Sequence, residues 1–129
     1  MPTSVDWHDP QETIIRTAFI GNWTIEDFIE ALQQTKILAQ TKPAGSVAVI
    51  IDVEKSSGLP RNANIIPHLR RGFQNMQYEQ VIFAGGTSFG ITLVRTVSRM
   101  IPESQRIIFF EDSLPNAEAR IAQSRAASG

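Results

Sequence analysis

A chain of 129 residues with 42% hydrophobic and 19% charged residues has the size and composition of one folded domain, which excludes a wholly disordered protein. The net charge of −1 provides no excess of cations to replace the counterions of a nucleic acid, and the lack of cysteine excludes disulfides, thiolate catalysis and cysteine-bound metals. The N-terminus lacks a secretory pattern and no apolar run has the length of a membrane helix, so we expect a cytoplasmic protein that is not an integral membrane protein.

The first elements expected along the chain are a hairpin and a helix. Residues 13–20 are rich in β-branched and aromatic side chains and follow a turn signal, so residues 5–8 are expected to pair with them. Thr24 is expected to cap the helix that follows. Trp23 is expected to pack on Phe28 across the first turn of this helix.

Two buried strands with a helix between them are expected next. Residues 46–53 form a nearly continuous apolar run, which is typical of a strand covered on both faces. Residues 80–84 form a second such run. The intervening helix is expected to have Pro67 in its first turn, where a missing N–H is tolerated. This helix carries apolar side chains at helical spacing, at Ile66, Leu69, Phe73 and Met76.

The last third of the chain predicts a helix, a strand and another helix. The helix begins after the Gly-Gly-Thr-Ser sequence that follows residue 84, and the strand occupies residues 106–110. The final helix spans about 114–124, and residues 126–129 are expected to be a frayed tail. The side chains of the first of these helices that are expected to face the core are Leu93, Val94, Val97, Met100 and Ile101.

The expected order of elements is therefore β-β-α-β-α-β-α-β-α in one domain over residues 1–129. Strands that alternate with helices predict parallel strand pairs joined by right-handed crossovers. The fold class is α/β, with a mostly parallel sheet and helices packed on it.

The sequence from Gly86 to Gly90 matches the G-x-S-x-G pattern of a hydrolase nucleophile. That mechanism requires an acid and a histidine after the serine, whereas His8 and His68 both precede Ser88. We therefore expect a turn in which Thr87 or Ser88 caps the next helix. A bound anion at the glycines and free N–H groups is the alternative.

Acidic residues end two of the predicted strands, at Asp52 and at Glu111 with Asp112. Such carboxylates could form a phosphate-receiving pocket with Mg²⁺, but that site needs a lysine after the last strand and Lys55 is the last lysine of the chain. The two histidines also lack metal-ligand spacing, so we expect no metal and no cofactor.

The second half of the chain is rich in arginine, which we interpret as the solvated face of amphipathic helices. An anionic ligand or a lipid headgroup is the alternative for these side chains. They are Arg61, Arg70, Arg71, Arg95, Arg99 and Arg106.

Two segments carry a resemblance to a known family. IIDVEKSSGL at residues 50–59 and IIFFEDSLPNAEARI at residues 107–121, with the order of elements, resemble the STAS family of anti-sigma-factor antagonists. More closely, the chain resembles short stand-alone bacterial STAS-like proteins, whose fold is akin to CRAL-TRIO lipid-transfer domains. The resemblance implies a STAS-like domain and a switch in which a partner kinase phosphorylates Ser56, with Ser57 as its neighbour.

The two serines also have a simpler interpretation as part of a turn. Lys55 stands where antagonists have an aspartate, and the next helix is expected to begin several residues after Ser57. We therefore favour a loop in which Gly58 adopts an unusual backbone angle, with phosphorylation as the alternative.

The function expected from these observations is a non-enzymatic regulatory or protein-interaction domain, of the kind used in partner-switching pathways. The alternative is a carrier of a lipid or other small apolar or anionic ligand, with a cavity lined by Phe73, Phe83, Phe89 and Met100. The residues expected at the partner or ligand surface are Lys55, Gly58, Arg61, Asn62, Gly85, Gly86, Thr87 and Ser88.

Overall fold

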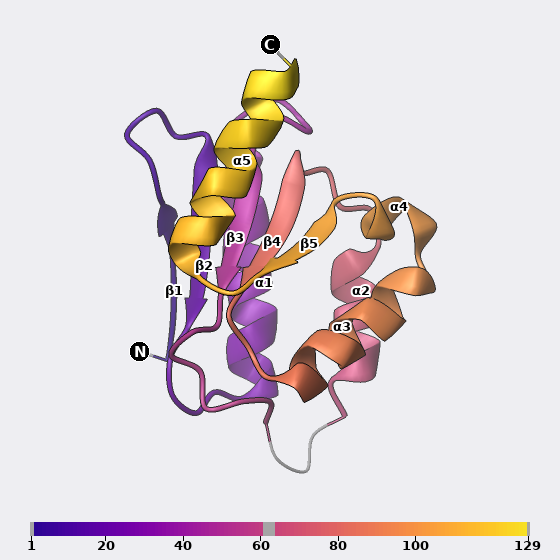
Figure 1. Cartoon of the computed structure of the whole chain (residues 1–129). Helices are drawn as coiled ribbons and strands as arrows, with labels where there is room; N and C mark the ends of the chain where they lie inside the picture. Colours follow the sequence, from indigo (N-terminus) through magenta and orange to yellow (C-terminus); the bar gives the residue numbers. More distant parts are fainter. Residues whose placement is uncertain (1, 61–63, 129) are drawn as a thin grey trace.

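The computed structural model describes residues 2–60 and 64–128, which form an α/β fold around one five-stranded mixed sheet (Figure 1). The strands are adjacent in chain order, with β1 antiparallel to β2 and every later pair parallel. The expected mostly parallel sheet is confirmed. The strands are β1 (Thr3–Trp7), β2 (Ile14–Phe19), β3 (Ala48–Asp52), β4 (Gln80–Ala84) and β5 (Ile108–Glu111).

The helices cover the two faces of the sheet unequally. Helices α1, α2 and α3 pack on one face, and α5 packs on the other, over β3, β4 and β5 (Figure 1). None of the helices in the described residues is both long and apolar enough to cross a membrane. The helices are α1 (Ile25–Ala39), α2 (Ile66–Phe73), α3 (Ser88–Arg99), α4 (Pro102–Gln105) and α5 (Leu114–Ser128).

The start of α1 agrees with its sequence signals. The hydroxyl of Thr24 accepts a hydrogen bond from the N–H of Asp27, and the carboxylate of Asp27 accepts one from the N–H of Thr24. Each interaction satisfies an N–H that the helix itself cannot pair. The Trp23 and Phe28 rings stack with centroids 5.9 Å apart, so the expected contact across the first turn is confirmed.

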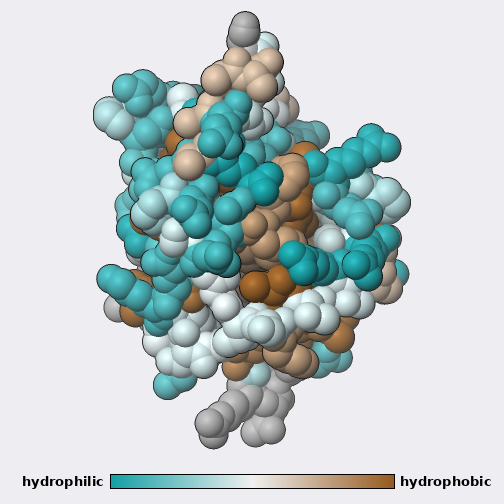
Figure 2. Space-filling model, viewed as in Figure 1, coloured by the Kyte–Doolittle hydropathy of each residue, from teal (hydrophilic) through white to brown (hydrophobic). Residues whose placement is uncertain are grey.

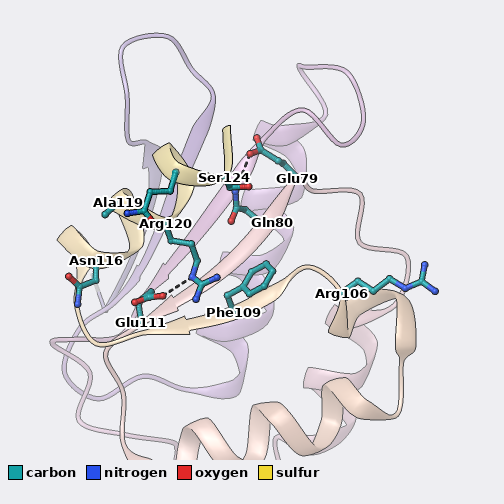
Figure 3. Close-up of a pocket in the computed structure, with 10 residues that line it drawn as sticks. Glu79, Gln80, Arg106, Phe109, Glu111, Asn116, Ala119, Arg120 and Ser124 are labelled. Atoms are coloured by element: carbon teal, nitrogen blue, oxygen red, sulfur yellow. Dashed lines mark hydrogen bonds and ion pairs between the residues drawn. The ribbon is translucent and has the colours of Figure 1, made fainter. Parts of the chain in front are cut away.

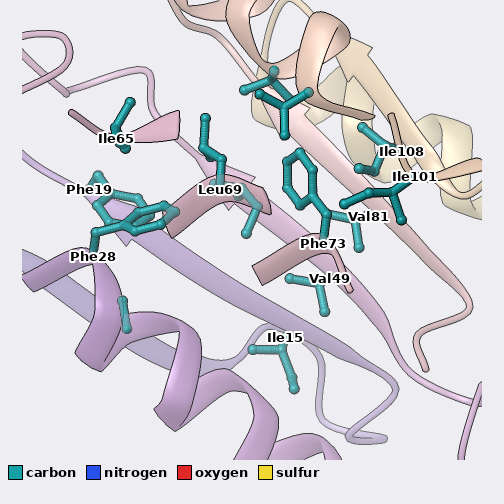
Figure 4. Close-up of a cluster of buried hydrophobic side chains, with 14 of the residues drawn as sticks. Ile15, Phe19, Phe28, Val49, Ile65, Leu69, Phe73, Val81, Ile101 and Ile108 are labelled. Carbon is teal, nitrogen blue, oxygen red and sulfur yellow. The ribbon is translucent and has the colours of Figure 1, made fainter. Parts of the chain in front are cut away.

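The larger hydrophobic cluster fills the layer between the sheet and α1–α3 (Figure 4). Strand side chains such as Ile15 and Val49 meet Leu69 and Phe73 of α2 and Val97 of α3. One polar pair is embedded in this layer: the buried hydroxyls of Thr17 and Thr35 lie 2.7 Å apart, and Thr35 also donates to a backbone carbonyl of α1. Every polar group of this pair therefore has a partner.

The smaller cluster lies between the opposite face and α5. Ile50 and Ile82 project from the central strands and are fully buried against Ala117 and Ile121 of α5. The small alanine side chain lets the helix backbone approach the sheet closely, because it leaves little volume between them.

One helix was not expected from the sequence. The chain turns through α4 between α3 and β5, so the expected order of elements is wrong by one short helix. Pro102 occupies the first turn, where it needs no N–H partner, and the buried hydroxyl of Ser104 donates to the carbonyl of Ile101. In the sequence, this proline and the few polar residues after it predict a loop and not a helix.

Three further expectations are corrected. Residues 126–128 are not frayed but continue α5, because Arg125 binds Glu79 and the hydroxyl and carbonyl of Thr13 and so fixes the last turns to the sheet. Met76 lies beyond the end of α2. Met100 caps the end of α3 with 54% of its surface exposed and does not face the core.

Candidate binding cavity at the carboxyl edge of the sheet

A cavity of about 250 Å³ opens where the parallel strands end, between the sheet, α2 and α3. Its walls come from segments far apart in the sequence: Phe19 and Ile51 from the sheet, Leu69 from α2, and Val94 from α3. The lining is predominantly apolar, with polar groups only near the rim. Cavities with these properties at the carboxyl edge of a parallel sheet are common places for small ligands.

Three aromatic rings form one wall of the cavity. Phe19, Trp23 and Phe28 pack on one another with centroid separations of 4.9 and 5.9 Å. Because Phe19 ends β2 and Trp23 precedes α1, the short connection between these elements orders the wall. Such packed rings resist collapse into the empty space, which helps to keep the cavity open.

Ser56 supplies a hydroxyl at the rim. Its oxygen accepts a hydrogen bond from the indole N–H of Trp23 at 2.8 Å and from the N–H of Gly58 at 3.1 Å. Among the residues that the structure describes, the hydroxyl proton has only the carbonyl of Gly58 as a partner, at an oxygen–oxygen distance of 3.4 Å. Because that contact is long, this proton is the group best placed to be donated to an acceptor on a ligand.

The backbone around Ser56 is held beside the end of β2. The N–H of Gly21 donates to the carbonyl of Lys55, and the N–H of Ser57 donates to the carbonyl of Gly21. The expected loop is confirmed, because α2 begins only at Ile66 and the φ angle of Gly58 is +112°, in the region that favours glycine.

A close approach of two loops explains the glycine at position 85. A Cβ atom there would lie 3.0 Å from the backbone of Glu54 and 2.9 Å from its side chain. The φ angle of Gly85 is +84°, which L side chains rarely adopt. Any larger residue would push apart the loops after β3 and β4, and these two loops form part of the rim.

The structure brings together four of the residues predicted for the partner or ligand surface and one of the two serines predicted as phosphorylation sites. Those that line the cavity are Ser56, Gly58, Gly85, Gly86 and Thr87. Lys55, Ser57 and Ser88 are exposed nearby and do not line it. Arg61 and Asn62 lie outside the described residues.

The residues expected to line a carrier cavity are only partly right. Phe83 lines it, whereas Phe73 is buried in the core away from it. Phe89 and Met100 are wrong, since they expose 71% and 54% of their surfaces to solvent. Phe89 lies on the outer side of the first turn of α3, and the cavity is lined instead by Gly90, Ile91 and Val94 of that helix.

The turn before α3 has the predicted helix cap. The hydroxyl of Thr87 accepts a hydrogen bond from the N–H of Gly90 at 3.1 Å. Ser88 is the first helical residue and is exposed. His8 lies 3.3 Å from Glu118, and no ion pair or side-chain hydrogen bond of the described residues joins either histidine to Ser88.

Two of the acidic residues at the strand ends, Asp52 and Glu111, are paired with arginines. The Asp52 carboxylate accepts two hydrogen bonds from Arg16, at 2.6 and 3.0 Å, and Glu111 pairs with Arg120 at 2.6 Å. Among the residues with described positions there is no group of three or more histidine, aspartate or glutamate side chains that could hold a metal ion. These acids therefore act as ion-pair partners within the fold.

The aromatic wall is the part of the site that sequence reasoning missed. From the sequence, Trp23 and Phe28 are expected only to pack at the start of α1, and Phe19 only to belong to a strand. The available signal was the short spacing of three large aromatic residues around a turn, but this pattern does not indicate which side of the rings is empty.

A scan against models of known protein families finds no match for the chain, and a search of curated proteins finds none either.

Proposed function

We propose that this chain is a binding domain that holds a small, mainly apolar molecule in the cavity, without a catalytic step of its own. The observation that carries the proposal is the apolar cavity with one hydroxyl at its rim. Its volume of about 250 Å³ corresponds to roughly eight non-hydrogen atoms on the scale of ~30 Å³ per molecule in liquid water. A short-chain alcohol or acid, whose oxygen accepts from Ser56, fits this description.

Tryptophan fluorescence tests this proposal directly. The chain has two tryptophans, so a Trp7→Phe variant leaves Trp23, in the cavity wall, as the single reporter. We expect 1-hexanol or hexanoic acid, added to this variant, to change the Trp23 emission in a saturable way. Native mass spectrometry should show one bound probe molecule per chain.

A matched pair of variants separates cavity binding from surface binding. Val94→Phe places a larger side chain in the cavity and should abolish the fluorescence change. Thr92→Phe adds a phenylalanine to the exposed side of the same helix and should leave the change intact. Equal responses of the two variants, or no saturable response of the parent protein to either probe, would overturn the proposal.

A second proposal is a STAS-like regulatory role in which a protein partner docks at the same end of the molecule. Two observations favour it. Ser57 is exposed next to the cavity rim, and Ile66 and Phe89 expose apolar side chains at the starts of α2 and α3. A phosphate on Ser57 would add close to two negative charges beside this apolar surface.

The regulatory proposal is tested in cells of the protein's own host. A partner captured by cross-linking should be lost with Phe89→Ser and reduced with Ser57→Asp, while Ile37→Ser on the distant α1 surface should retain it. Intact-mass analysis should detect phosphorylation that disappears in Ser57→Ala. Retention of the partner by both test variants argues against docking at this end.

A further inference from the structure

The last strand of the sheet has an unpaired backbone edge. Within the described residues β5 pairs only with β4, through bonds that include the N–H of Val81 with the carbonyl of Ile107 and the N–H of Gly85 with the carbonyl of Glu111. In a parallel pair, alternate residues bond to the same neighbour. The N–H and C=O groups of Ile108 and Phe110 therefore point away from β4, to the free edge.

β5 carries apolar side chains on both faces and ends at Glu111. Phe109 faces the open groove beside α5, where the guanidinium of Arg120 lies 4.6 Å from its ring centroid (Figure 3). Phe110 faces the opposite layer, with Arg95 of α3 over its ring at 4.8 Å. In Figure 2 an apolar strip between hydrophilic side chains occupies the region where Figure 1 places β4 and β5. β5 contains no lysine or proline, which are common protections of an edge strand.

The charges that flank β5 are opposite at its two ends. Arg106 precedes the strand and Asp112 follows it, and both are exposed. Neither forms an ion pair or a side-chain hydrogen bond with any described residue. The segment from 106 to 112 therefore contains one cation, four apolar residues and two anions, in this order. When two copies of the segment run antiparallel, the cation of each copy can lie opposite an anion of the other.

We propose that β5 is the interface of a homodimer, in which the β5 strands of two copies pair antiparallel about a two-fold axis at Phe109. In this register Ile108 lies opposite Phe110 of the second copy, so the residues with free backbone groups on both chains bond to each other. The same register places Arg106 opposite Asp112 of the second copy, twice by symmetry. The five-stranded sheets of the two copies would join into one continuous sheet of ten strands.

The other edge of the sheet lacks this complementarity. β1 is followed by His8, whose N–H donates to the carbonyl of Ile14 next to β1. The carbonyl of Pro2, before β1, accepts from the N–H of Ile20. Within β1, Ser4 and Asp6 are exposed and there is no cation to oppose Asp6 of a second copy. Antiparallel pairing of two β1 strands about Val5 would place Asp6 opposite Ser4 of the second copy, so no ion pair would support it.

Charge reversal provides the test. Sedimentation or light scattering of the parent protein at up to about 100 µM should show a dimer, since edge interfaces of modest area are occupied in this range. Arg106→Glu and Asp112→Arg should each raise the dissociation constant about tenfold or more, because each places two like-charged pairs across the axis. Both sites are exposed, so the fold should be retained, as circular dichroism would verify.

Mixing the two variants distinguishes this register from other associations. In the heterodimer, Glu at 106 faces Arg at 112, and Asp112 faces Arg106, so both attractive pairs return and the dimer should reappear. Arg99→Glu changes the same charge on the exposed surface of α3 and should remain dimeric. A monomeric parent protein, dimeric single variants, or a mixture that stays monomeric would each overturn the proposal, whatever the cavity binds.

Discussion

The two faces of the sheet are packed in different ways. On one face α5 covers the central strands directly, and Ile50, Ile82 and Ala117 are fully buried, while an open groove lined by Phe109 and Arg120 lies beside this helix. On the other face three helices surround a larger apolar layer that contains the cavity. One long helix can follow the sheet surface closely, whereas the space where two helices and two loops converge must be filled by side chains. The centre of the α5 face is therefore closed by its helix, whereas the mainly apolar cavity lies within the α1–α3 face.

The largest expected difference between the faces comes from neighbouring residues of β3. Ile50 faces α5 and Ile51 faces the cavity. We expect Ile50→Ala to reduce the free energy of unfolding by about 4 kcal/mol and Ile51→Ala by about 2 kcal/mol, because part of the Ile51 surface already borders empty space. Urea denaturation of both variants measures the difference. Equal losses would mean that the cavity is filled or collapsed in solution.

Enlarging a side chain is expected to have an intermediate effect on stability, and the effect should differ between the two faces. Ala117→Leu inserts three carbon atoms into the closed layer and should destabilise the protein by about 2 kcal/mol. Val94→Leu extends into the cavity and should change stability by less than about 0.5 kcal/mol, since empty volume is available. Thermal denaturation should rank the two variants in this order, and the reverse ranking would contradict the assignment of empty space to the α1–α3 face.

The smallest effect is expected at the hairpin, outside both layers. Burial alone would raise the pKa of Asp9, but hydrogen bonds from the hydroxyl and N–H of Thr13 and the N–H of Ile14 outweigh it and lower the pKa. Because the folded pKa is below the unfolded value of about 3.9, the stabilisation is present above that pH and is lost as pH falls through the folded value.

Asp9→Asn therefore should lower stability at pH 7 by only about 0.5 kcal/mol, because solvent screens the charge of this partly exposed carboxylate. The difference from the parent protein should shrink below about pH 4, as Asp9 takes up its proton. Denaturation at a series of pH values checks both points. A difference that stays constant down to pH 2 would show that the carboxylate charge is unimportant there.

The strands and most helix boundaries could be predicted because their causes are local. The continuous apolar run at residues 80–84 gives β4 with its observed bounds, and the Thr24 cap gives the start of α1. The end of α5 could not be predicted, because it depends on Arg125 reaching Glu79 and Thr13, which are distant in sequence. Helix α4 was missed since four residues with a proline carry too little periodic signal.

The candidate site was predictable only in its loops. Glycines and serines after two parallel strands indicated which turns would meet at the carboxyl edge, and Ser56, Gly85 and Thr87 do line the cavity. The empty volume depends on how the helices are spaced, which no single segment encodes. Phe89 shows what the sequence does not encode. An aromatic residue near the start of a helix is expected in the core, but Phe89 lies on the side of α3 that faces solvent.

The position of α5 in the chain has a consequence for synthesis. All five strands precede α5, which alone supplies Ala117 and Ile121 to cover Ile50 and Ile82. During translation the sheet can therefore form its α1–α3 layer while its second face remains bare until α5 leaves the ribosome. For that interval the nascent chain exposes a flat apolar surface next to an open strand edge, and we expect it to be the stage at which chaperones bind and aggregation begins.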